Sequence, residues 1–525
     1  MESQPNADLW ILIVVVIAIV GIGLWLLTRS GNADTQKQVD VERRGGSPPS
    51  HFWPYPWNKV MGSEPVKRLR TAFFTDEMNE TSDVIFGGSR MGKTSHLIGQ
   101  MIIIVIRRIA GATRSSWVFF EPHGDASVEL FDRLALLYRK FRKQLERLIC
   151  YIDLTDENLV IGFNPLAGRG HPMRRAKKFT DAVLAIFHDD PTQANRLYRV
   201  LYKASLTLIY ANRPMTDIPK LLTDEEYRAT ILLGVPDEEL KQYWKRQFPR
   251  DYLRALELTE STLNRIERIL SDFVVARMLS APVTFDPEDI VRRGVFVIIR
   301  APKWEIGDDA AYFALGMFLT ALYQAAGARP KGERHRLIFF CDEFVNYLVP
   351  ALASIPSEGG KMGVKAVYCT QNVKSHIQDE VMLANILNSC QNIMTFRLGY
   401  SEAESVVREV MLPDLDQIKF VERKFRFSGS IPTMDEHITF RSPEEIYLRA
   451  IREIQLLPKR TMLWYTKGSL RTRRVMTTTI RDIEQIADEQ TRKCAREELL
   501  VAVKCWYGQP PAGNFYSDDG EVFWE

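Results

Sequence analysis

Residues 87–94 read Gly-Gly-Ser-Arg-Met-Gly-Lys-Thr, which is a complete phosphate-binding loop of the form G-x-x-x-x-G-K-[ST]. A short apolar run, Val84–Phe86, precedes the loop, and an apolar stretch with helical character follows at 95–109. Glycine lets the backbone wrap closely around a phosphate, so that N–H groups and the helix N-terminus point at the anion. This strand–loop–helix context predicts the core of a nucleotide-binding α/β protein. The alternative is a glycine-rich turn beside a solvated lysine.

The loop supplies the expected nucleotide ligands. We expect Lys93 to place its ammonium group against the β- and γ-phosphates, and Thr94 to offer its hydroxyl to Mg²⁺. ATP and Mg²⁺ are therefore the predicted cofactors. The predicted nucleotide-binding residues are Gly87, Gly88, Ser89, Arg90, Met91, Gly92, Lys93, Thr94 and Ser95.

A second half of the site lies far downstream, where the apolar run at 337–341 is followed by Asp342 and Glu343. Strands buried on both faces read as continuous apolar runs, and ligands of open α/β sheets bind beyond the carboxyl ends of the strands. We therefore predict that Asp342 holds Mg²⁺ and that Glu343 orients or deprotonates an attacking water. A solvated strand end is the alternative for such a pair taken alone. Another expected strand, 364–370, is followed by Gln371, the candidate sensor of the γ-phosphate.

Composition sets broad limits. The net charge of the 525-residue chain is +3, so a nucleic-acid contact must come from local basic patches. The six cysteines are scattered and form no C-x-x-C pair. This pattern favours free thiols in a reducing compartment over a zinc site or a disulfide framework.

The N-terminus is expected to be a membrane anchor. Residues 9–27 form an uncharged apolar run, which as a helix would span about 29 Å, close to the hydrocarbon thickness of a bilayer. Trp10 and Trp25 lie near its ends, where indoles prefer the interface. Basic residues follow the run and none precedes it, so the bulk of the chain should face the cytoplasm. The alternatives are a signal peptide, which lacks its basic start here, and a buried helix.

The strand and helix patterns give the predicted fold class: a mainly parallel, RecA-like α/β sheet with helices on both faces. The expected strands are 83–87, 116–121, 148–153, 294–300, 336–342, 364–370 and 392–397. Between 172 and 284 only helical patterns occur, which predicts an all-α insertion. The predicted segments are a short extracytoplasmic N-terminus (1–8), a transmembrane helix (9–28), a linker (29–70), the first part of the nucleotide-binding domain (71–171), the insertion (172–284), its second part (285–483) and a C-terminal helix with an acidic tail (484–525).

The chain resembles the coupling ATPases of conjugation and type IV secretion, the TraD/TraG family, which is related to the HerA and FtsK translocases. The resemblance covers residues 80–470 and depends on an ordered set of short motifs. Besides the phosphate loop, this set comprises Phe120-Glu-Pro-His-Gly-Asp125, Gly162-Phe-Asn-Pro-Leu166, Leu221–Arg228, Tyr243-Trp, Asp342-Glu-Phe344, Thr370-Gln371, and Asn388 followed by Phe396-Arg397.

The resemblance implies a ring, expected to be a homo-hexamer, that passes DNA bound to a relaxase into a secretion channel at the inner membrane. Its implied partners are DNA, relaxosome proteins, channel components and the lipid bilayer. Such a motor needs cations that neutralise phosphates without reading bases. The candidates are Arg174, Arg175, Lys177, Lys178, Arg196, Arg199 and Lys203 in the insertion, and Arg471, Arg473 and Arg474; a solvated helix face is the alternative for each.

One departure from the family concerns the arginine that some relatives carry after the acidic strand. Here the segment reads Glu358-Gly-Gly-Lys361, so Gly360 takes the arginine position. An arginine acting in trans is worth about 10³–10⁵ in rate where it operates. We expect another cation to replace it, and the candidates are Arg397 and Lys361. The predicted catalytic set is thus Glu343, Lys93, Gln371 and Arg397.

Two other functions stay open at this stage. The insertion and the acidic tail could form a recruitment platform for secreted proteins or a relaxosome, in which nucleotide mainly controls assembly. A housekeeping translocase of the FtsK or HerA kind is the other alternative. Hydrolysis that responds to added DNA separates the motors from the platform.

Overall fold

The computed structural model describes residues 81–189, 194–371, 380–411, 419–428, 431–440, 442–467, 472–477 and 480–508. The predicted membrane helix at 9–28, the linker, Arg471 and the acidic end of the tail lie outside these residues. The membrane anchor and the domain limits therefore stay predictions.

A nine-stranded sheet forms the centre of the protein, in the order β11-β10-β7-β1-β6-β5-β2-β4-β3. The seven strands from β7 to β3 in this order are parallel to their neighbours. Almost all of their residues are buried, which explains why each reads as a continuous apolar run. The strands are β1 Asp83–Phe86, β2 Ser116–Glu121, β3 Ile149–Asp153, β4 Phe296–Arg300, β5 Leu337–Cys341, β6 Val364–Thr370 and β7 Asn392–Thr395.

The mainly parallel α/β sheet predicted from the sequence is confirmed, and the ends of the seven expected strands differ by at most two residues. Two strands that were not predicted, β10 (Thr461–Thr466) and β11 (Thr472–Met476), extend the sheet in antiparallel pairing beside β7. Arg473 and Arg474 lie on β11, most of which is exposed, so no apolar run marks this edge strand. The antiparallel pair β8 (Lys419–Ser428) and β9 (Ile431–Phe440) was also not predicted.

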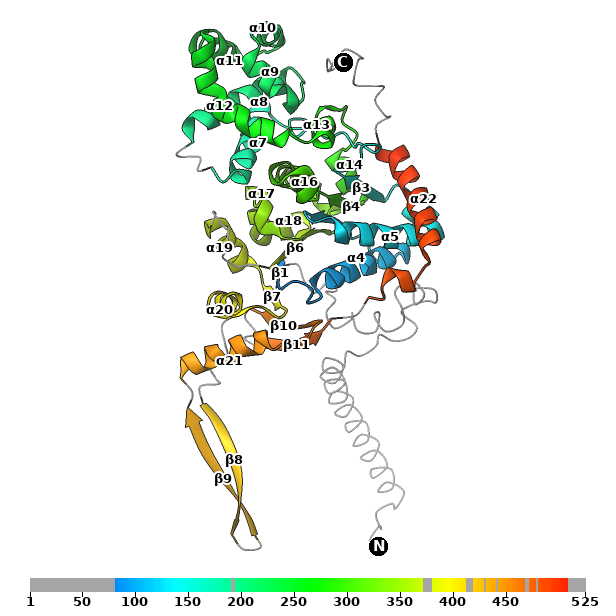
Figure 1. Ribbon diagram of the computed structural model, residues 1–525, viewed down its shortest axis with the longest axis vertical. Coiled ribbons are helices and arrows are strands. Elements are labelled where there is room, and N and C mark those ends of the chain that lie inside the picture. The colour runs from blue at the N-terminus through cyan, green and yellow to red at the C-terminus, as the bar shows by residue number, and fades with distance from the viewer. Residues whose placement is uncertain are drawn as a thin grey trace, which may run out of the picture.

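Helices cover both faces of the sheet, as right-handed connections between parallel strands require. The chain runs from β1 to β2 to β3 in one direction along the sheet, and returns through β4, β5, β6 and β7 in the other. Figure 1 shows α4 and α5 with the C-terminal α22 on one side of the sheet, and α16 to α19 on the other. The first group, with α6 between α5 and β3, is α4 Lys93–Ile109, α5 Asp125–Lys140, α6 Arg142–Leu145 and α22 Glu489–Tyr507. The second is α16 Asp308–Ala328, α17 Pro350–Ser354, α18 Gly360–Met362 and α19 Glu380–Ser389, and the short α15 (Lys303–Ile306) precedes α16.

Between β3 and β4 the described residues contain helices and no strand. The stretch 174–211, part of the predicted all-α insertion, contains the two helices α7 and α8, which pack together. Pro191 lies in the sequence between these two helices. The helices of this segment are α7 Pro172–Ile186, α8 Asn195–Tyr210, α9 Ile218–Thr223, α10 Glu225–Leu233, α11 Glu238–Gln242, α12 Tyr252–Ile269, α13 Phe273–Ser280 and α14 Pro287–Arg293.

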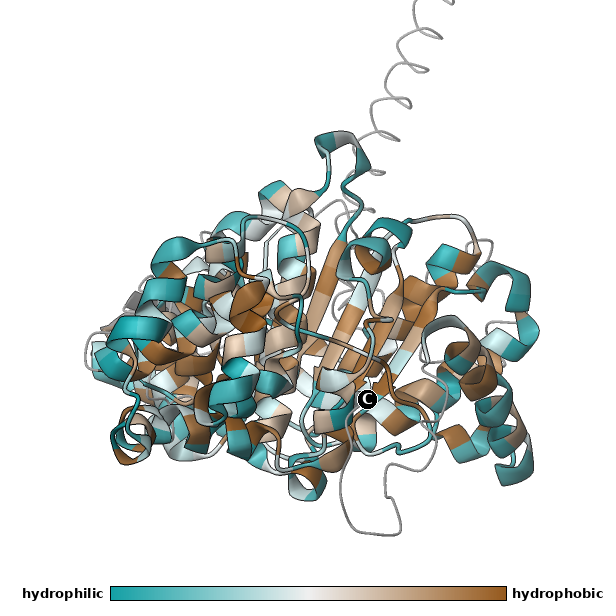
Figure 2. Ribbon diagram, turned by 90° about the horizontal axis from the view of Figure 1, so that it is seen from above, coloured by the Kyte–Doolittle hydropathy of each residue, from teal (hydrophilic) through white to brown (hydrophobic). Residues whose placement is uncertain are grey.

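One helix of the described residues, α16, is long and apolar enough to cross a membrane by length and composition. It packs against α7, α14 and α17, and 72% of its most apolar window is buried inside the protein, so it is a core helix here. Seen from above, the apolar strands lie between helices that carry most of the hydrophilic residues (Figure 2). The remaining helices are α20 Tyr400–Glu409 and α21 Pro443–Gln455, which pack together near β10 and β11 (Figure 1).

The C-terminal α22 packs along α5. Arg496 of α22 donates two hydrogen bonds to the buried Asp132 of α5, at 2.6 and 2.5 Å. A bidentate guanidinium–carboxylate pair fixes both distance and orientation. The C-terminal helix is therefore part of the folded core up to Tyr507.

Candidate functional site: a nucleotide-binding cavity

The phosphate loop connects the end of β1 to the start of α4, as predicted. Gly92, directly before α4, has φ of 110°, a left-handed conformation that favours glycine. A Cβ atom on Gly87 would lie 2.8 Å from Cβ of Phe396, so a larger residue at 87 would force the loop away from the sheet. These two glycines thus set the path of the loop for steric reasons.

Backbone hydrogen bonds hold the start of the loop against the sheet. Gly87 N–H donates to the carbonyl of Thr370 at 3.3 Å, and Gly88 N–H donates to the carbonyl of Arg397 at 3.0 Å. No side chain caps the N-terminus of α4. The later part of the loop lines a cavity of about 430 Å³, together with the first residues of α4. An uncapped helix N-terminus beside a cavity suits an anion, because its first N–H groups and its dipole are available.

The acidic pair reaches the same cavity from the end of β5. Lys93 Nζ donates to Glu343 Oε1 at 3.2 Å, and both side chains are buried. The other carboxylate oxygen of Glu343 accepts from the N–H of Gln371 at 3.3 Å. Glu343 itself has φ of 44°, an uncommon conformation for a non-glycine residue that occurs often at functional sites. Two distant motifs thus meet at one charge pair.

Asp342 is also buried and lines the cavity with Thr94. Burial raises the pKa of the Asp342 carboxyl above its usual range, Lys93 opposes this shift, and the negative charge of Glu343 adds to it. Two carboxylates with one nearby ammonium group leave uncompensated negative charge when ionised. The residues present therefore fit a hard divalent cation such as Mg²⁺, which Asp342 and the Thr94 hydroxyl would hold.

Gln371 lies against the phosphate loop, because Ser89 Oγ donates to Gln371 Oε1 at 2.8 Å. The two cations proposed to replace the missing arginine are placed differently. Arg397 holds Gly88 through its backbone carbonyl, but its side chain is exposed and does not line the cavity within the described structure. Lys361 is likewise exposed and outside this lining. In this single chain, neither side chain reaches the cavity.

The structure adds site residues that the sequence analysis did not assign. Lys459 and Arg460, in the loop before β10, line the cavity. Arg460 N–H donates to the carbonyl of Met91 at 2.9 Å, and the Arg460 side chain packs against Gly92. Arg460 also has a positive φ of 63°. These two cations come from the same chain, and no local pattern in the sequence marks them.

The end of β2 and the residues after it supply a further wall of the cavity, formed by the carboxylates of Glu121 and Asp125 and the imidazole of His123. Glu121 accepts hydrogen bonds from the N–H groups of Ala126 at 3.1 Å and Ser127 at 2.8 Å, at the start of α5. Burial raises the pKa of Glu121 to about 7, and the charge of Asp342 contributes in the same direction. These residues lie within the motif 120–125, which the sequence analysis quoted without giving it a site role.

The basic candidates of the helical segment divide into two groups. Several are engaged within the protein: Lys177 pairs with Asp181 at 2.9 Å, and Lys203 lies 3.9 Å from Glu239. Arg175 donates to the carbonyl of Leu166, and Arg199 donates to Gln247. Exposed side chains without an ion-pair partner in the described part of the chain remain on α7 and α8. They are Arg174, Lys178 and Arg196.

Comparison with solved structures places this geometry in a known fold. The unbound monoclinic form of the bacterial conjugative coupling protein TrwBdeltaN70 superposes with a TM-score of 0.50 and 15% sequence identity, over 77% of this chain and 88% of that chain. The chain has the fold of the coupling protein TrwB. The resemblance to coupling ATPases is thereby confirmed at the level of the fold.

Two other solved structures are similar at lower scores. TrwB in complex with ADP and Mg²⁺ has a TM-score of 0.48 and 13% identity, over 78% of this chain and 90% of that one. VirB4 of Thermoanaerobacter pseudethanolicus has a TM-score of 0.45 and 12% identity, over 80% of this chain and 92% of that one. No protein-family model and no curated protein matches the sequence.

Proposed function

We propose that the chain is a membrane-anchored, ATP-driven DNA translocase that acts as a coupling protein of conjugation or type IV secretion. The observation that carries this proposal is the contact of Lys93 with Glu343 in a cavity that also contains the phosphate loop and Asp342. The TrwB-like fold of the described chain supports the same function, because TrwB is a conjugative coupling protein.

The residues of the cavity have separate roles in the proposed hydrolysis of ATP. The loop amides and Lys93 bind the phosphates and offset their charge. Glu343 is the general base: its carboxylate orients a water and accepts its proton. Mg²⁺, when bound between Thr94 and Asp342, would neutralise charge on the transferred phosphate. Gln371, which contacts Ser89 of the loop, senses whether the γ-phosphate is present.

Lys459 and Arg460 provide positive charge from within the same chain. Both line the cavity, and Arg460 is fixed to the phosphate loop through Met91. We assign them the charge-stabilising role that the arginine replaced by Gly360 has in some relatives. Arg397, whose side chain is exposed, remains a candidate for contact with a neighbouring subunit in the proposed homo-hexamer.

Passage of DNA asks for cations that contact the phosphate backbone. Arg174, Lys178 and Arg196 are exposed on α7 and α8, and they supply such contacts in this proposal. Relaxosome proteins, channel components and the inner membrane are the proposed partners, with the span at 9–28 as the anchor.

The test is ATP hydrolysis by the full-length chain in detergent, measured with and without DNA. Wild-type hydrolysis should rise with DNA, and Lys93→Ala should lose both basal and stimulated activity. Lys143→Ala, which removes an exposed lysine outside the cavity lining, is the matched control and should behave as wild type. Wild-type hydrolysis that ignores DNA would favour the recruitment platform.

A further inference from the structure

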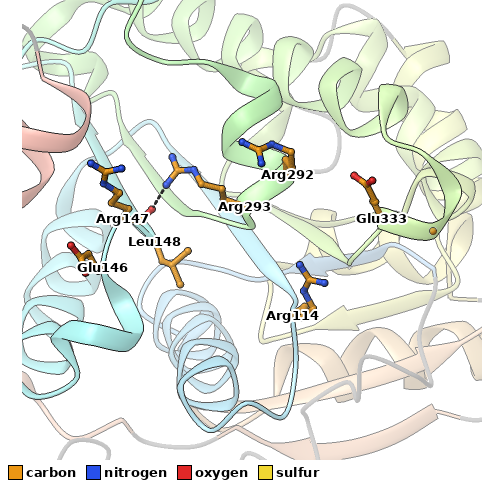
Figure 3. A pocket seen from close by; sticks show the side chains of 8 residues that line it. Arg114, Glu146, Arg147, Leu148, Arg292, Arg293 and Glu333 are labelled. Atoms are coloured by element: carbon orange, nitrogen blue, oxygen red, sulfur yellow. Dashed lines mark hydrogen bonds between the residues drawn. The ribbon is translucent and has the colours of Figure 1, made fainter.

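A second charged cavity lies at the amino-terminal ends of the strands, opposite to the nucleotide cavity at their carboxyl ends. It has a volume of about 680 Å³, and we call it the arginine pocket after Arg114, Arg147, Arg292 and Arg293. Its other lining residues are Glu146, Leu148, Gly332 and Glu333. Figure 3 shows that these side chains come from separate segments around one hollow.

The position of the pocket follows from the topology. Arg114 precedes β2, residues 146–148 precede β3, Arg292 and Arg293 end α14 just before β4, and Glu333 precedes β5. These strands are adjacent and parallel, so their amino ends meet at one edge. The nucleotide cavity lies at their carboxyl ends, where ligands of such sheets usually bind. The arginine pocket is therefore a separate site.

The backbone of the pocket is held in an uncommon shape. Arg147 has φ of 57°, and its carbonyl accepts from Arg293 Nη1 at 2.7 Å and from the Tyr507 hydroxyl at 2.9 Å. Arg293 also pairs with Asp289 at 2.6 Å and donates to the Tyr507 hydroxyl at 3.0 Å, so each of its three side-chain nitrogens has a partner. Arg293 and Tyr507 thus hold Arg147 in a backbone conformation that is uncommon for a non-glycine residue.

The pocket has an excess of positive charge. Four guanidinium groups and two carboxylates line it, and a third carboxylate, Asp289, pairs with Arg292 at 2.5 Å and Arg293 at 2.6 Å, so four cations stand against three anions. The exposed side chains of Arg114 and Arg147 have no ion-pair partner within the described part of the chain. The charge of Arg114 also contributes, after burial, to the lowered pKa of Arg108 close by. Cations are crowded here, and an anion would relieve their repulsion.

The chemistry of the lining selects the anion. Planar guanidinium groups match phosphate oxygens in two-point contacts. A nucleotide pocket would also offer apolar or aromatic surface for the base, whereas Leu148 is the sole apolar side chain in this lining. A ligand that presents phosphates and keeps its bases elsewhere fits this composition.

We propose that the arginine pocket binds the phosphodiester backbone of DNA, at the edge of the sheet opposite the nucleotide cavity. This proposal rests on the proposed function for its ligand. Arg114 and Arg147 contact the phosphates, while Arg293 and Tyr507 position Arg147.

The experiment measures anisotropy of a labelled single-stranded oligonucleotide of mixed sequence with the full-length chain, between 0.05 and 0.3 M salt (about the range in which phosphate contacts are resolved). Each phosphate contact contributes roughly 0.7 to the slope of log affinity against log salt for single strands. Arg114→Gln/Arg147→Gln should weaken binding and reduce this slope by about 1.4. The variant Arg114→Lys/Arg147→Lys, which keeps both positive charges, should retain most of the wild-type slope of log affinity against log salt.

The control is Arg254→Gln/Arg481→Gln, which removes two exposed arginines outside the pocket and should leave binding unchanged. Basal hydrolysis without DNA should be equal in all variants. Wild-type-like binding by the pocket variant would overturn this proposal alone, whereas a wild-type chain that binds no DNA would overturn the proposed function as well. The Arg114→Gln/Arg147→Gln variant could also lose binding of pyrophosphate or fluorescent ADP while it still binds the oligonucleotide. That result would show that the pocket binds a free anion, and it would reject the proposal that the pocket binds the DNA backbone.

Discussion

Lys93 Nζ lies 3.2 Å from Glu343 Oε1, although 250 residues separate the two in the chain. The ammonium group belongs to the phosphate loop and the carboxylate to the end of β5. Two strands, β1 and β5, sit on either side of β6, and their carboxyl ends open at the same edge of the sheet. The contact therefore joins the phosphate-binding and the proposed hydrolytic halves of one site.

Replacing Glu343 by glutamine should lower the hydrolysis rate by about 10²–10⁴-fold, because an amide cannot accept a proton from water. Nucleotide binding should persist, since the loop and Lys93 stay intact. Phosphate release and binding of a fluorescent ATP analogue measure the two effects. Glu358→Gln, at an exposed carboxylate outside the cavity, is the control. A Glu343→Gln chain that hydrolyses ATP at the wild-type rate would rule out this base.

Arg460→Gly should separate activity from stability. Glycine accepts the φ of 63° more readily than arginine, so the melting temperature should stay within a few degrees of wild type. Hydrolysis should fall by about 10²-fold if Arg460 stabilises charge on the phosphates. Asn212→Gly makes the same backbone change at an exposed residue with φ of 52° and should leave the rate unchanged. Equal rates in the two variants would remove Arg460 from the catalytic groups.

Lys365→Met should destabilise the protein by about 3–5 kcal/mol, since it leaves a buried carboxylate unpaired. Lys365 Nζ lies 2.6 Å from Asp83 Oδ2, and the Asp83 side chain is fully buried at the start of β1. Burial raises the pKa of Asp83, and Lys365 opposes this shift. Thermal unfolding measures the loss. Asp83→Asn/Lys365→Met should recover much of it, and Lys331→Met, at an exposed lysine, should cost little.

The buried His96 should by itself lower the stability of the protein as the pH drops from about 6.5 towards 4, in opposition to the buried carboxyls whose pKa values are raised. Burial lowers the pKa of this histidine to about 4, so the folded protein keeps it neutral while the unfolded chain takes up a proton. Protonation of His96 in the unfolded chain costs no stability above pH 6.5. As the pH falls towards 4, it lowers the free energy of unfolding, by about 2 kcal/mol between pH 7 and 5. His96→Gln should therefore show a smaller difference in melting temperature between pH 7 and 5 than wild type. If wild type and His96→Gln showed the same difference in melting temperature between pH 7 and 5, His96 would not be the source of this pH dependence.

The two halves of the candidate nucleotide site were readable from the sequence for a local reason. The phosphate loop needs glycine at two fixed positions, and β5 is an apolar strand buried on both faces that ends in Asp342 and Glu343. Each of these two signals is contained within about ten consecutive residues, and neither depends on the rest of the fold. The seven parallel strands were predictable on the same grounds.

The tertiary structure alone decided which distant groups share a cavity. Arg397, chosen from the sequence, contributes its backbone carbonyl and turns its side chain to solvent, whereas Lys459 and Arg460 reach the phosphate loop from an unpredicted antiparallel extension. The arginine pocket likewise exists only because β5, β2, β4 and β3 are neighbours, which brings four separate segments of the chain together. Strand order is fixed by packing among distant elements, and no local pattern of residues encodes it.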